Sequence, residues 1–559
     1  MEPGTPRGGA ESIAALLRAA EPATSRALSG LVDRLRSHGD SVSIVWPGVT
    51  PSGRVSVDGG GDDRSDAALA AIMLAGVTAD SRSVGPGSLF VAIPGSRADG
   101  HRFAADAEGA GAAALLVEHA LPDRSIPQIL VPHARPMLAE AAAWWYGDPA
   151  RELGVVGITG TDGKTTTSFL AASALEATGI RTGLLGTVAI QIGGRREANQ
   201  IHSTTPEAPY VQRALRAMTM AGDAAAIIET TSHGLAMDRV RAIDYDVAIL
   251  TNLTHEHLEL HGSFEAYRSA KLRLFESLVW VGMKRAGRSW PRTGIVNVDD
   301  PSAAIFVAAT RAAGARAIGF GAARDAEVRL LGTVDDHGGL RVDYGLAGSQ
   351  RAFRLQLAGR FNAHNALAAV ALGWALDLDP SAVESGLEAV AAVAGRMELV
   401  DQGQPFSVVI DYAHSPASLA TVLDELGPRA AAGGGGLIAV FGSAGERDRD
   451  KRPMMGRIAA ERCRIVILTD EDPRGEGRGA ILGEIAAGAG LAGHRPEAIL
   501  QVADRSVAIR TALERARPGD VVLLAGKGHE TTIEYADRQL PWDERAEAER
   551  ALADLGWGR

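Results

Sequence analysis

Short apolar runs alternate with segments of helical spacing from Val77 to the end of the chain. The segments between the runs predict helices. The runs that predict buried strands include residues 88–93, 155–158, 225–228, 247–250, 437–441 and 465–468. Regular alternation of strands and helices is typical of parallel sheets, in which ligands bind beyond the carboxyl ends of the strands. We therefore predict an α/β protein whose functional residues lie in the loops that follow the strands.

Changes in this pattern divide the chain into an extension and three domains. Residues 1–65 contain two stretches of helical spacing around Pro22, and a stretch rich in glycine and aspartate at residues 58–63 is typical of a flexible linker. We therefore treat residues 1–65 as a variable N-terminal extension. The α/β pattern after the extension predicts three domains, which cover residues 66–149, 150–394 and 395–559.

A glycine-rich turn in the second domain lies between a predicted strand and a predicted helix. Backbone N–H groups of such a turn, the helix dipole and a lysine together favour phosphate groups, and a threonine hydroxyl can bind Mg²⁺. Strict Walker A spacing needs glycine at the position of Ile158, so this is a variant phosphate loop. The residues predicted to bind the nucleotide here are Gly160, Thr161, Asp162, Gly163, Lys164, Thr165 and Thr166.

Polar residues also follow other predicted strands of the second domain. Glu229 directly follows the strand at residues 225–228, where phosphate-loop enzymes place a metal-binding carboxylate. His255, His257 and His261 suggest a zinc site, but the HExxH order is absent. We therefore prefer a single histidine in a Mg²⁺ or nucleotide site.

Five further residues of this domain have two interpretations each. Thr205 and Pro206 either belong to a ligand site or begin a helix. Asn362 and Asn365 share one face of an alanine-rich helix, where they would bind a ligand or cap the helix. Lys271 lies between apolar neighbours in a helix, and periodicity does not distinguish a functional lysine from a surface one.

The third domain repeats this arrangement of loops. Four apolar strands run into loops rich in charged residues and glycine, which begin at Asp411, Gly442, Thr469 and Ala525. Because the carboxyl ends of parallel strands meet at one edge of a sheet, these loops predict a second ligand-binding edge.

Composition limits the environment and the partners of the protein. The net charge of −11 argues against nucleic acid and acidic membranes as partners. The single cysteine, Cys463, excludes an intrachain disulfide, and we find neither a signal-peptide pattern nor an uncharged apolar window of about 18 residues. We therefore expect a monomeric cytoplasmic enzyme that acts on small molecules.

Taken together and in this order, the motifs resemble those of the Mur ligase family, the ATP-dependent enzymes that build the peptide of bacterial peptidoglycan. The resemblance is to the tripeptide synthetase (MurE) branch and runs from about Val77 to the end. It implies a central phosphate-loop ATPase domain between an N-terminal domain that binds a UDP-linked precursor and a Rossmann-like C-terminal domain that binds an amino acid. The motifs that carry it are residues 80–82, 159–166, 204–207, 229–233, 359–365, 395–398, 411–416, 446–453 and 526–530.

The resemblance also implies ATP and Mg²⁺ as cofactors, and it assigns roles to individual residues. The implied catalytic residues are Lys164, Glu229, His257 and Lys271. The implied metal-site residues are Thr165, Glu229, His257 and Lys271, the last as a carbamylated lysine. Further contacts to ATP are implied for Asn362, Asn365, Arg396, Asp411 and His414. Contacts to UDP-MurNAc-L-Ala-D-Glu are implied for Ser81, Ser96, Arg97, Ala98, Thr204, Thr205, Thr231 and Arg239. The implied pocket for the incoming amino acid consists of Arg447, Glu471, Asp472, Arg474, Gly526 and Glu530.

Two departures from the family pattern bear on the substrate. Family members that add meso-diaminopimelate carry Asp-Asn-Pro-Arg where this chain has Glu471-Asp472-Pro473-Arg474. The retained arginine favours meso-diaminopimelate, because a guanidinium can bind its distal carboxylate. Asp472 adds a negative charge, which keeps L-lysine and L-ornithine as alternatives. Met237 stands where the family often has glutamine.

Other functions remain as alternatives at this point. A folylpolyglutamate or cyanophycin synthetase would share the ligase chemistry, but residues 80–82 and the Pro473-Arg474 loop favour the tripeptide synthetase branch. A phosphate-loop kinase would not need a third domain with four ligand loops. A regulator without catalysis would not need the complete set of Lys164, Glu229, His257 and Lys271.

Overall fold

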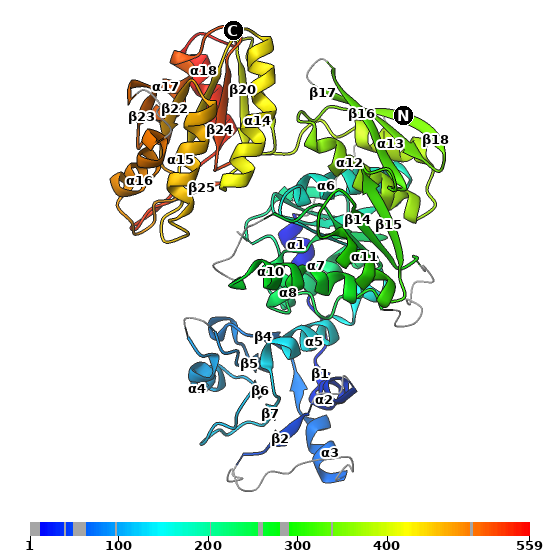
Figure 1. Ribbon diagram of the computed structural model, residues 1–559. Coiled ribbons are helices and arrows are strands. Elements are labelled where there is room, and N and C mark those ends of the chain that lie inside the picture. Colours follow the sequence, from blue (N-terminus) through cyan, green and yellow to red (C-terminus); the bar gives the residue numbers. More distant parts are fainter. Residues whose placement is uncertain are drawn as a thin grey trace, which may run out of the picture.

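Three α/β domains follow one another along the chain in the computed structural model (Figure 1). The structure describes residues 12–37, 41–47, 63–95, 98–201, 203–254, 261–279, 290–336, 339–491 and 496–558. The N-terminal domain, drawn in blue and cyan, and the C-terminal domain, drawn in yellow to red, lie at opposite ends of the central domain. Among the described helices, we find none with the length and apolar character needed to cross a bilayer.

The N-terminal domain is built on a five-stranded sheet. Its strands, in spatial order, are β2 (Ser43–Val45), β7 (Gln128–Leu130), β6 (Ala114–Val117), β5 (Ser88–Val91) and β4 (Gly76–Thr78). Strands β4 to β7 are parallel, and β2 joins the edge antiparallel. The remaining elements are α1 (Ile13–Ala19), β1 (Arg26–Ala27), α2 (Leu28–Ser37), α3 (Asp63–Ala71), β3 (Met73–Leu74), η1 (Ser81–Ser83), η2 (Gly100–Phe103), α4 (Ala104–Gly109) and α5 (Ala134–Tyr146).

The predicted extension over residues 1–65 is wrong for part of that range. Strand β2 hydrogen-bonds to β7, and Leu35 of α2 is fully buried in the core that the sheet shares with α5. Helix α1 instead packs on the central domain, where Ile13 and Leu17 join the core. Helical spacing predicted these helices, but it could not show which sheet each helix would cover.

The central domain is built on an 11-stranded mixed sheet. Its strands, in spatial order, are β11 (Arg195–Ala198), β10 (Ala189–Ile192), β9 (Thr182–Leu185), β12 (Ala225–Glu229), β8 (Gly154–Thr159), β13 (Val247–Leu250), β14 (Thr293–Asn297), β15 (Arg316–Gly321), β16 (Val328–Asp336), β17 (Gly339–Leu346) and β18 (Ser349–Leu355). The seven neighbouring strands β9, β12, β8, β13, β14, β15 and β16 are parallel, as predicted. Strands β10 and β11 extend one edge of the sheet in antiparallel fashion, and β17 and β18 extend the other. These edge strands include half-exposed ones such as β18, in which one face of the sheet remains solvated.

Helices cover both faces of the central sheet. Val156 and Ile158 of β8 belong to the core under α6 (Lys164–Ala177) and α12 (Phe361–Ala375), whereas Val155 belongs to the core on the opposite face. Because successive strand residues point to opposite faces, a strand buried on both sides is apolar throughout. The other helical elements are η3 (Pro149–Arg151), α7 (Ala208–Met220), α8 (Ser232–Ala236), α10 (Phe264–Glu276), α11 (Ala303–Ala312) and α13 (Pro380–Glu388).

The C-terminal domain is built on a six-stranded sheet that is parallel except for its first strand. Its strands, in spatial order, are β19 (Glu398–Val400), β20 (Ser407–Asp411), β24 (Val521–Ala525), β21 (Leu437–Phe441), β22 (Ile465–Leu468) and β23 (Ile499–Gln501). Strands β25 (Thr532–Glu534) and β26 (Gln539–Pro541) form a separate hairpin. The helical elements of this domain are α14 (Pro416–Ala432), α15 (Lys451–Arg462), α16 (Arg478–Leu491), η4 (Pro496–Ala498), α17 (Arg505–Arg515) and α18 (Glu544–Asp554). The four predicted loops therefore all begin at the same edge of this sheet, at the carboxyl ends of β20, β21, β22 and β24.

Candidate active site

The phosphate loop joins β8 to α6 and holds two glycines at positive φ. Gly160 has φ of 150° and Gly163 has φ of 81°. A Cβ atom at Gly160 would collide with the hydroxyl of Thr251, and one at Gly163 would collide with the side-chain oxygen of Asn365. Only glycine fits both positions. The loop thereby leads directly into the N-terminus of α6, where the helix dipole favours anions.

Two lysines converge on this loop from different elements. Lys164 Nζ donates to the carbonyls of Gly160 at 3.0 Å and Thr161 at 2.6 Å. Lys271 on α10 is buried, and its Nζ donates to the same Gly160 carbonyl at 2.7 Å and lies 4.5 Å from the ring centre of Tyr267. Lys271 is therefore not a surface lysine, and its Nζ lies beside the phosphate loop together with that of Lys164.

Glu229 lies at the end of β12 and is fully buried beside the phosphate loop. Its carboxylate accepts hydrogen bonds from Thr165 Oγ1 at 2.9 Å, Thr187 Oγ1 at 2.7 Å and Thr187 N at 2.9 Å. Within the described part of the chain, the ion pairs of the structure include none to this carboxylate. A buried carboxylate and a hydroxyl are hard oxygen donors that suit Mg²⁺, so these residues fit the predicted metal.

The other predicted metal residue, His257, lies outside the described residues, as does His255. Across the ranges that the structure describes, no group of three or more His, Cys, Asp or Glu side chains is placed to hold a metal ion. The zinc alternative thus gains no support from the described residues.

Three threonines that the resemblance assigned to the precursor lie around Glu229. Thr205 Oγ1 donates to the carbonyl of Glu229 at 2.8 Å and lies 3.1 Å from Thr231 Oγ1. Thr204 Oγ1 accepts a hydrogen bond from Thr187 Oγ1 at 2.9 Å, and Arg239 Nη1 donates to the carbonyl of Thr205 at 2.9 Å. The structure therefore brings these four residues together beside the buried carboxylate.

Two alternatives that the sequence left open are decided by helix geometry. Helix α7 has Glu207 as its N-cap, so Thr205 does not begin the helix. Helix α12 has Arg360 as its N-cap, so Asn362 and Asn365 do not cap it. Instead, Asn365 Nδ2 donates to Asn362 Oδ1 at 2.8 Å on the face that approaches the phosphate loop.

The C-terminal domain contributes a second set of polar residues. Arg396 Nη2 donates to Thr165 Oγ1 at 3.4 Å, and its guanidinium lies 4.8 Å from the ring centre of Tyr412. Asp411 accepts two backbone hydrogen bonds at 2.9 and 2.8 Å. Burial raises the pKa of Asp411, while the charge of Arg396 acts in the opposite direction. His414 Nδ1 lies 2.8 Å from the carbonyl of Tyr412.

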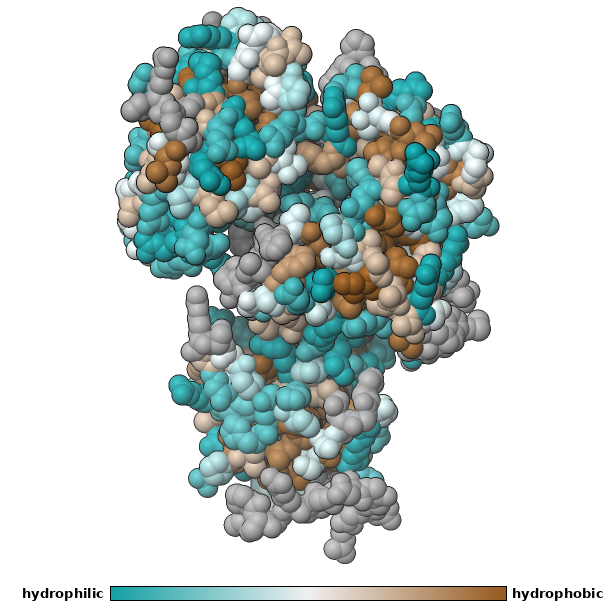
Figure 2. All heavy atoms as spheres, viewed as in Figure 1, coloured by the Kyte–Doolittle hydropathy of each residue, from teal (hydrophilic) through white to brown (hydrophobic). Residues whose placement is uncertain are grey.

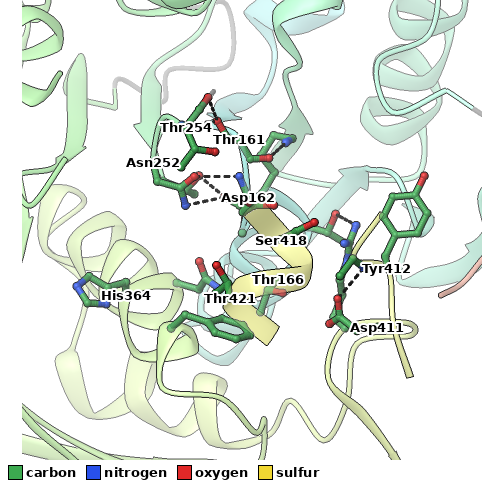
Figure 3. Close-up of a pocket in the computed structure, with 18 of the residues that line it drawn as sticks. Thr161, Asp162, Thr166, Asn252, Thr254, His364, Asp411, Tyr412, Ser418 and Thr421 are labelled. Carbon is green, nitrogen blue, oxygen red and sulfur yellow. Dashed lines mark hydrogen bonds between the residues drawn. The ribbon is translucent and has the colours of Figure 1, made fainter. Parts of the chain in front are cut away.

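These residues surround a cleft of about 500 Å³ between the central and C-terminal domains. Figure 3 shows Asp162 and Thr166 of the phosphate loop and first helical turn beside Ser418 and Thr421 of α14. Figure 2 shows a hollow between the C-terminal domain, at the upper left, and the central domain, with mostly hydrophilic residues at its visible rim. A volume of this size is typical of small-molecule sites.

A smaller hollow of about 110 Å³ adjoins the cleft. It shares Thr187, Thr204 and Tyr412 with the cleft, and it reaches His529 and Glu530 on the loop after β24. The hollow at the predicted amino-acid loops therefore lies next to the cleft at the phosphate loop.

The predicted amino-acid residues lie on three loops at the edge of the C-terminal sheet. Glu471, Asp472 and Arg474 follow β22, Gly526 and Glu530 follow β24, and the exposed Arg447 follows β21. Lys527 was not predicted as a site residue, although its position between Gly526 and Gly528 on this loop could have indicated a role.

Lys527 is completely buried and bonds to two of these carboxylates. Its Nζ lies 2.8 Å from Asp472 Oδ1 and 2.5 Å from Glu530 Oε2. Burial alone would lower the pKa of Lys527, but the charges of Glu530 and Asp472 outweigh burial and raise it. Glu530 also accepts a hydrogen bond from the hydroxyl of Tyr412, another residue that the sequence did not single out, at 3.1 Å.

The N-terminal residues of the prediction lie apart from this cleft. Asp80 caps the short η1 turn that contains Ser81 and pairs with Arg82 at 2.8 Å on the surface. The pairing with Arg82 lowers the pKa of Asp80. Ala98 is exposed, and Ser96 and Arg97 lie outside the described residues. The roles of these residues toward a UDP-linked precursor stay predictions.

Three family models match the chain. The Mur ligase family catalytic domain matches residues 74–146, the Mur ligase middle domain residues 158–373, and the Mur ligase glutamate ligase domain residues 395–528. The matched ranges follow the three sheets of the structure.

Relatives and a solved structure match nearly the whole chain. A protein of Roseiflexus sp. (strain RS-1) named UDP-N-acetylmuramyl-tripeptide synthetase is 46% identical over 87% of this chain and 96% of its own length. A protein of Solibacter usitatus (strain Ellin6076) named UDP-N-acetylmuramoyl-L-alanyl-D-glutamate–2,6-diaminopimelate ligase is 39% identical over 88% and 95%. A solved structure of a ligase with that same name has a TM-score of 0.60 at 29% identity and covers 86% of this chain and 95% of its own. The predicted three-domain fold is thereby confirmed, and the chain belongs to the Mur ligase family.

Proposed function

We propose that this protein is an ATP-dependent ligase that adds a diamino acid to the D-glutamate of UDP-MurNAc-L-Ala-D-Glu in cytoplasmic peptidoglycan precursor synthesis. One observation carries the proposal. The cleft at the phosphate loop, whose Thr165 bonds to the buried Glu229, lies next to the hollow that reaches Glu530 on the amino-acid loops. Names of relatives at 39–46% identity support the same reaction class.

The proposed reaction has two steps. The side-chain carboxylate of the D-glutamate attacks the γ-phosphorus of ATP, ADP leaves, and an acyl phosphate forms. The amine of the diamino acid then attacks the acyl carbon, phosphate leaves with the electron pair of the broken C–O bond, and the amine loses a proton. The protein needs no nucleophile of its own, so orientation and neutralisation of charge supply most of the catalysis.

Residues around the phosphate loop would provide that neutralisation. Lys164 would contact the phosphates, and Thr165 and Glu229 would hold Mg²⁺, together with His257 and a carbamylated Lys271 as the resemblance implies. When bound, Mg²⁺ would neutralise the negative charge of the phosphate groups. Asn362, Asn365, Arg396, Asp411 and His414 would contact ATP, whereas Ser81, Thr204, Thr205, Thr231 and Arg239 would contact the precursor.

Three diamino acids are candidates for the incoming substrate. The retained Arg474 makes meso-diaminopimelate the first expectation from the sequence, and several relatives are named 2,6-diaminopimelate ligases. L-Lysine and L-ornithine are the alternatives, because Asp472 adds a negative charge next to that arginine.

Release of phosphate from ATP tests the proposal. The purified protein should release phosphate only when UDP-MurNAc-L-Ala-D-Glu and one of the three diamino acids are both present. Reactions without the precursor or without the diamino acid are the controls. Absence of release with all three diamino acids would exclude the ligase, and turnover of ATP with precursor alone would favour the kinase alternative.

A second experiment tests the carbamate on Lys271. Lys271→Ala should lower the rate at least about 100-fold, because a metal-site residue contributes several kcal/mol to transition-state stabilisation. Short carboxylates such as formate should restore part of the rate, since they can enter the vacated space. Full activity of the variant without added carboxylate would remove this role.

A further inference from the structure

The β25–β26 hairpin lies against the loop of Arg474 and holds that arginine through Glu534. Arg474 Nε donates to Glu534 Oε2 at 3.0 Å, and the backbone N–H of Arg474 donates to the carbonyl of Glu534 at 3.0 Å. Arg474 also forms an isolated bridge with Tyr535 and has φ of 52°. A residue other than glycine keeps this conformation only where its surroundings enforce it. The contacts with Glu534, together with a 3.3 Å hydrogen bond from Arg474 Nη1 to the carbonyl of Gly445, therefore set the position of the guanidinium.

Glu534 is also tied to the centre of the predicted amino-acid pocket. Its backbone N–H donates to Asp472 Oδ1 at 2.9 Å, and the same oxygen accepts the bond from Lys527. The side chains of Arg474 and Glu534 retain 24% and 32% of their exposure. Their ion pair is thus partly open to solvent, so a substrate could compete for either partner.

Carboxylates outnumber cations around this pocket. The four carboxylates Glu471, Asp472, Glu530 and Glu534 meet three cations, which are Lys527, Arg474 and the exposed Arg447. The nearby buried Arg505 also interacts with the charges of Glu471 and Glu530, but Glu544 pairs with it at 2.5 Å, so the excess of one negative charge remains.

Glu471 has a carboxylate oxygen to which no described group donates a hydrogen bond. Its side chain is 7% exposed, and Oε2 has no hydrogen-bond partner among the described residues. This oxygen faces Gly526, where a Cβ atom would stand 3.0 Å away. A buried carboxylate oxygen without a partner is costly, so the site favours a ligand that brings an ammonium group.

We infer that Glu534 is a specificity-determining residue, which makes the pocket select a diamino acid with one carboxylate, of the L-lysine or L-ornithine class, over diaminopimelate. The inference rests on the proposed ligase function. A distal ammonium enters a pocket with excess negative charge. A distal carboxylate adds to that excess and must displace Glu534 from Arg474. The choice departs from the sequence-based expectation, which treated Arg474 as available.

The wild-type enzyme provides the first test. Values of kcat/KM from phosphate release, measured with L-lysine, L-ornithine and meso-diaminopimelate, should favour L-lysine or L-ornithine over meso-diaminopimelate by at least about tenfold. A preference for meso-diaminopimelate would overturn the inference and leave the ligase function intact. No release with any of the three would instead overturn the ligase function.

Glu534→Gln is the decisive variant, because it keeps the size of the side chain and removes its charge. The ratio of kcat/KM values should shift toward meso-diaminopimelate by at least about tenfold. The double variant Glu534→Gln/Arg474→Ala should lose that gain, since the freed guanidinium is what binds the distal carboxylate.

Glu514→Gln is the matched control. Glu514 also accepts a hydrogen bond from an arginine, Arg510, at 2.9 Å, but on the exposed face of α17, so its ratio should equal that of the wild type. Binding of a non-hydrolysable ATP analogue reports whether Glu534→Gln is folded. A folded Glu534→Gln variant with a ratio within about twofold of the wild type would overturn the inference. If this variant does not bind the analogue, the inference is judged by the substrate preference of the wild-type enzyme alone.

Discussion

Gly163 and Gly179 provide a matched pair for testing how the phosphate loop depends on its neighbours. They flank α6 and have nearly equal φ angles of 81° and 82°. A Cβ atom at Gly163 would collide with the side-chain oxygen of Asn365, whereas one at Gly179 would meet nothing within 4 Å. Alanine therefore introduces the same backbone strain at both positions but a steric conflict only at Gly163.

The expected difference follows from the contacts of Asn365. Alanine at positive φ costs about 1–2 kcal/mol at either position. At Gly163 the Asn365 amide must also move, which breaks its 2.8 Å bond to Asn362 and its 3.4 Å contact with Thr167. Because one hydrogen bond contributes about 0.5–1.5 kcal/mol, we expect Gly163→Ala to lose roughly 1–3 kcal/mol more than Gly179→Ala.

Binding of ATP should reveal where this loss falls. Asn365 lines the cleft, so Gly163→Ala should weaken binding of a non-hydrolysable ATP analogue by about tenfold or more. Gly179→Ala should bind the analogue like the wild type. Calorimetric titration measures the affinities, and urea denaturation of the central domain measures the shared strain. Equal effects of the two variants on both quantities would refute the reasoning.

Three further predictions concern the C-terminal domain. Cys463 is 4% exposed and burial raises the pKa of its thiol to about 12, so Ellman's reagent should label it only after unfolding; rapid labelling of the native protein would contradict this. Arg505→Met should lower the free energy of unfolding by about 3–5 kcal/mol, because Glu544 stays buried without its partner, and Arg505→Met/Glu544→Leu should recover part of the loss; an unchanged urea midpoint would argue against it. Burial lowers the pKa of Lys527, but Glu530 and Asp472 raise it more, to above its ordinary 10.5. The wild type should therefore have a higher free energy of unfolding than Lys527→Met, fully so below that ordinary pKa, and the difference should shrink as pH rises through the raised pKa. A difference that already shrinks between about pH 7 and 9 would contradict the ion pairs.

The predictability of the fold depended on burial. Residues 437–441 and 465–468 coincide with β21 and β22, because strands covered on both faces are continuous apolar runs. The edge hairpins β10–β11 and β16–β18 were not predicted. Their outer strands β11 and β18 are largely exposed, and such strands mix polar and apolar residues. Strand β2 was assigned to an extension because its pairing with β7 connects positions far apart in the chain.

The candidate site was predictable where its chemistry is local. Glycine spacing, the Lys164 that opens a helix and the Glu229 that ends a strand can all be identified in a short window of sequence. The bond between Lys271 and the carbonyl of Gly160 joins residues 111 positions apart, so periodicity around Lys271 could not indicate it. The same holds for Lys527 and Asp472, which are 55 positions apart.

The sequence by itself determined the family, the order of the three domains and the residue types that follow each strand, because these depend on local spacing. Only the tertiary structure decided which charges neutralise one another, because an ion pair depends on distance in space. From the sequence alone, the guanidinium of Arg474 was expected to be available for a substrate carboxylate, whereas in the folded protein it forms an ion pair with Glu534. That contact changes the expected substrate from a diamino acid with two carboxylates to one with a single carboxylate.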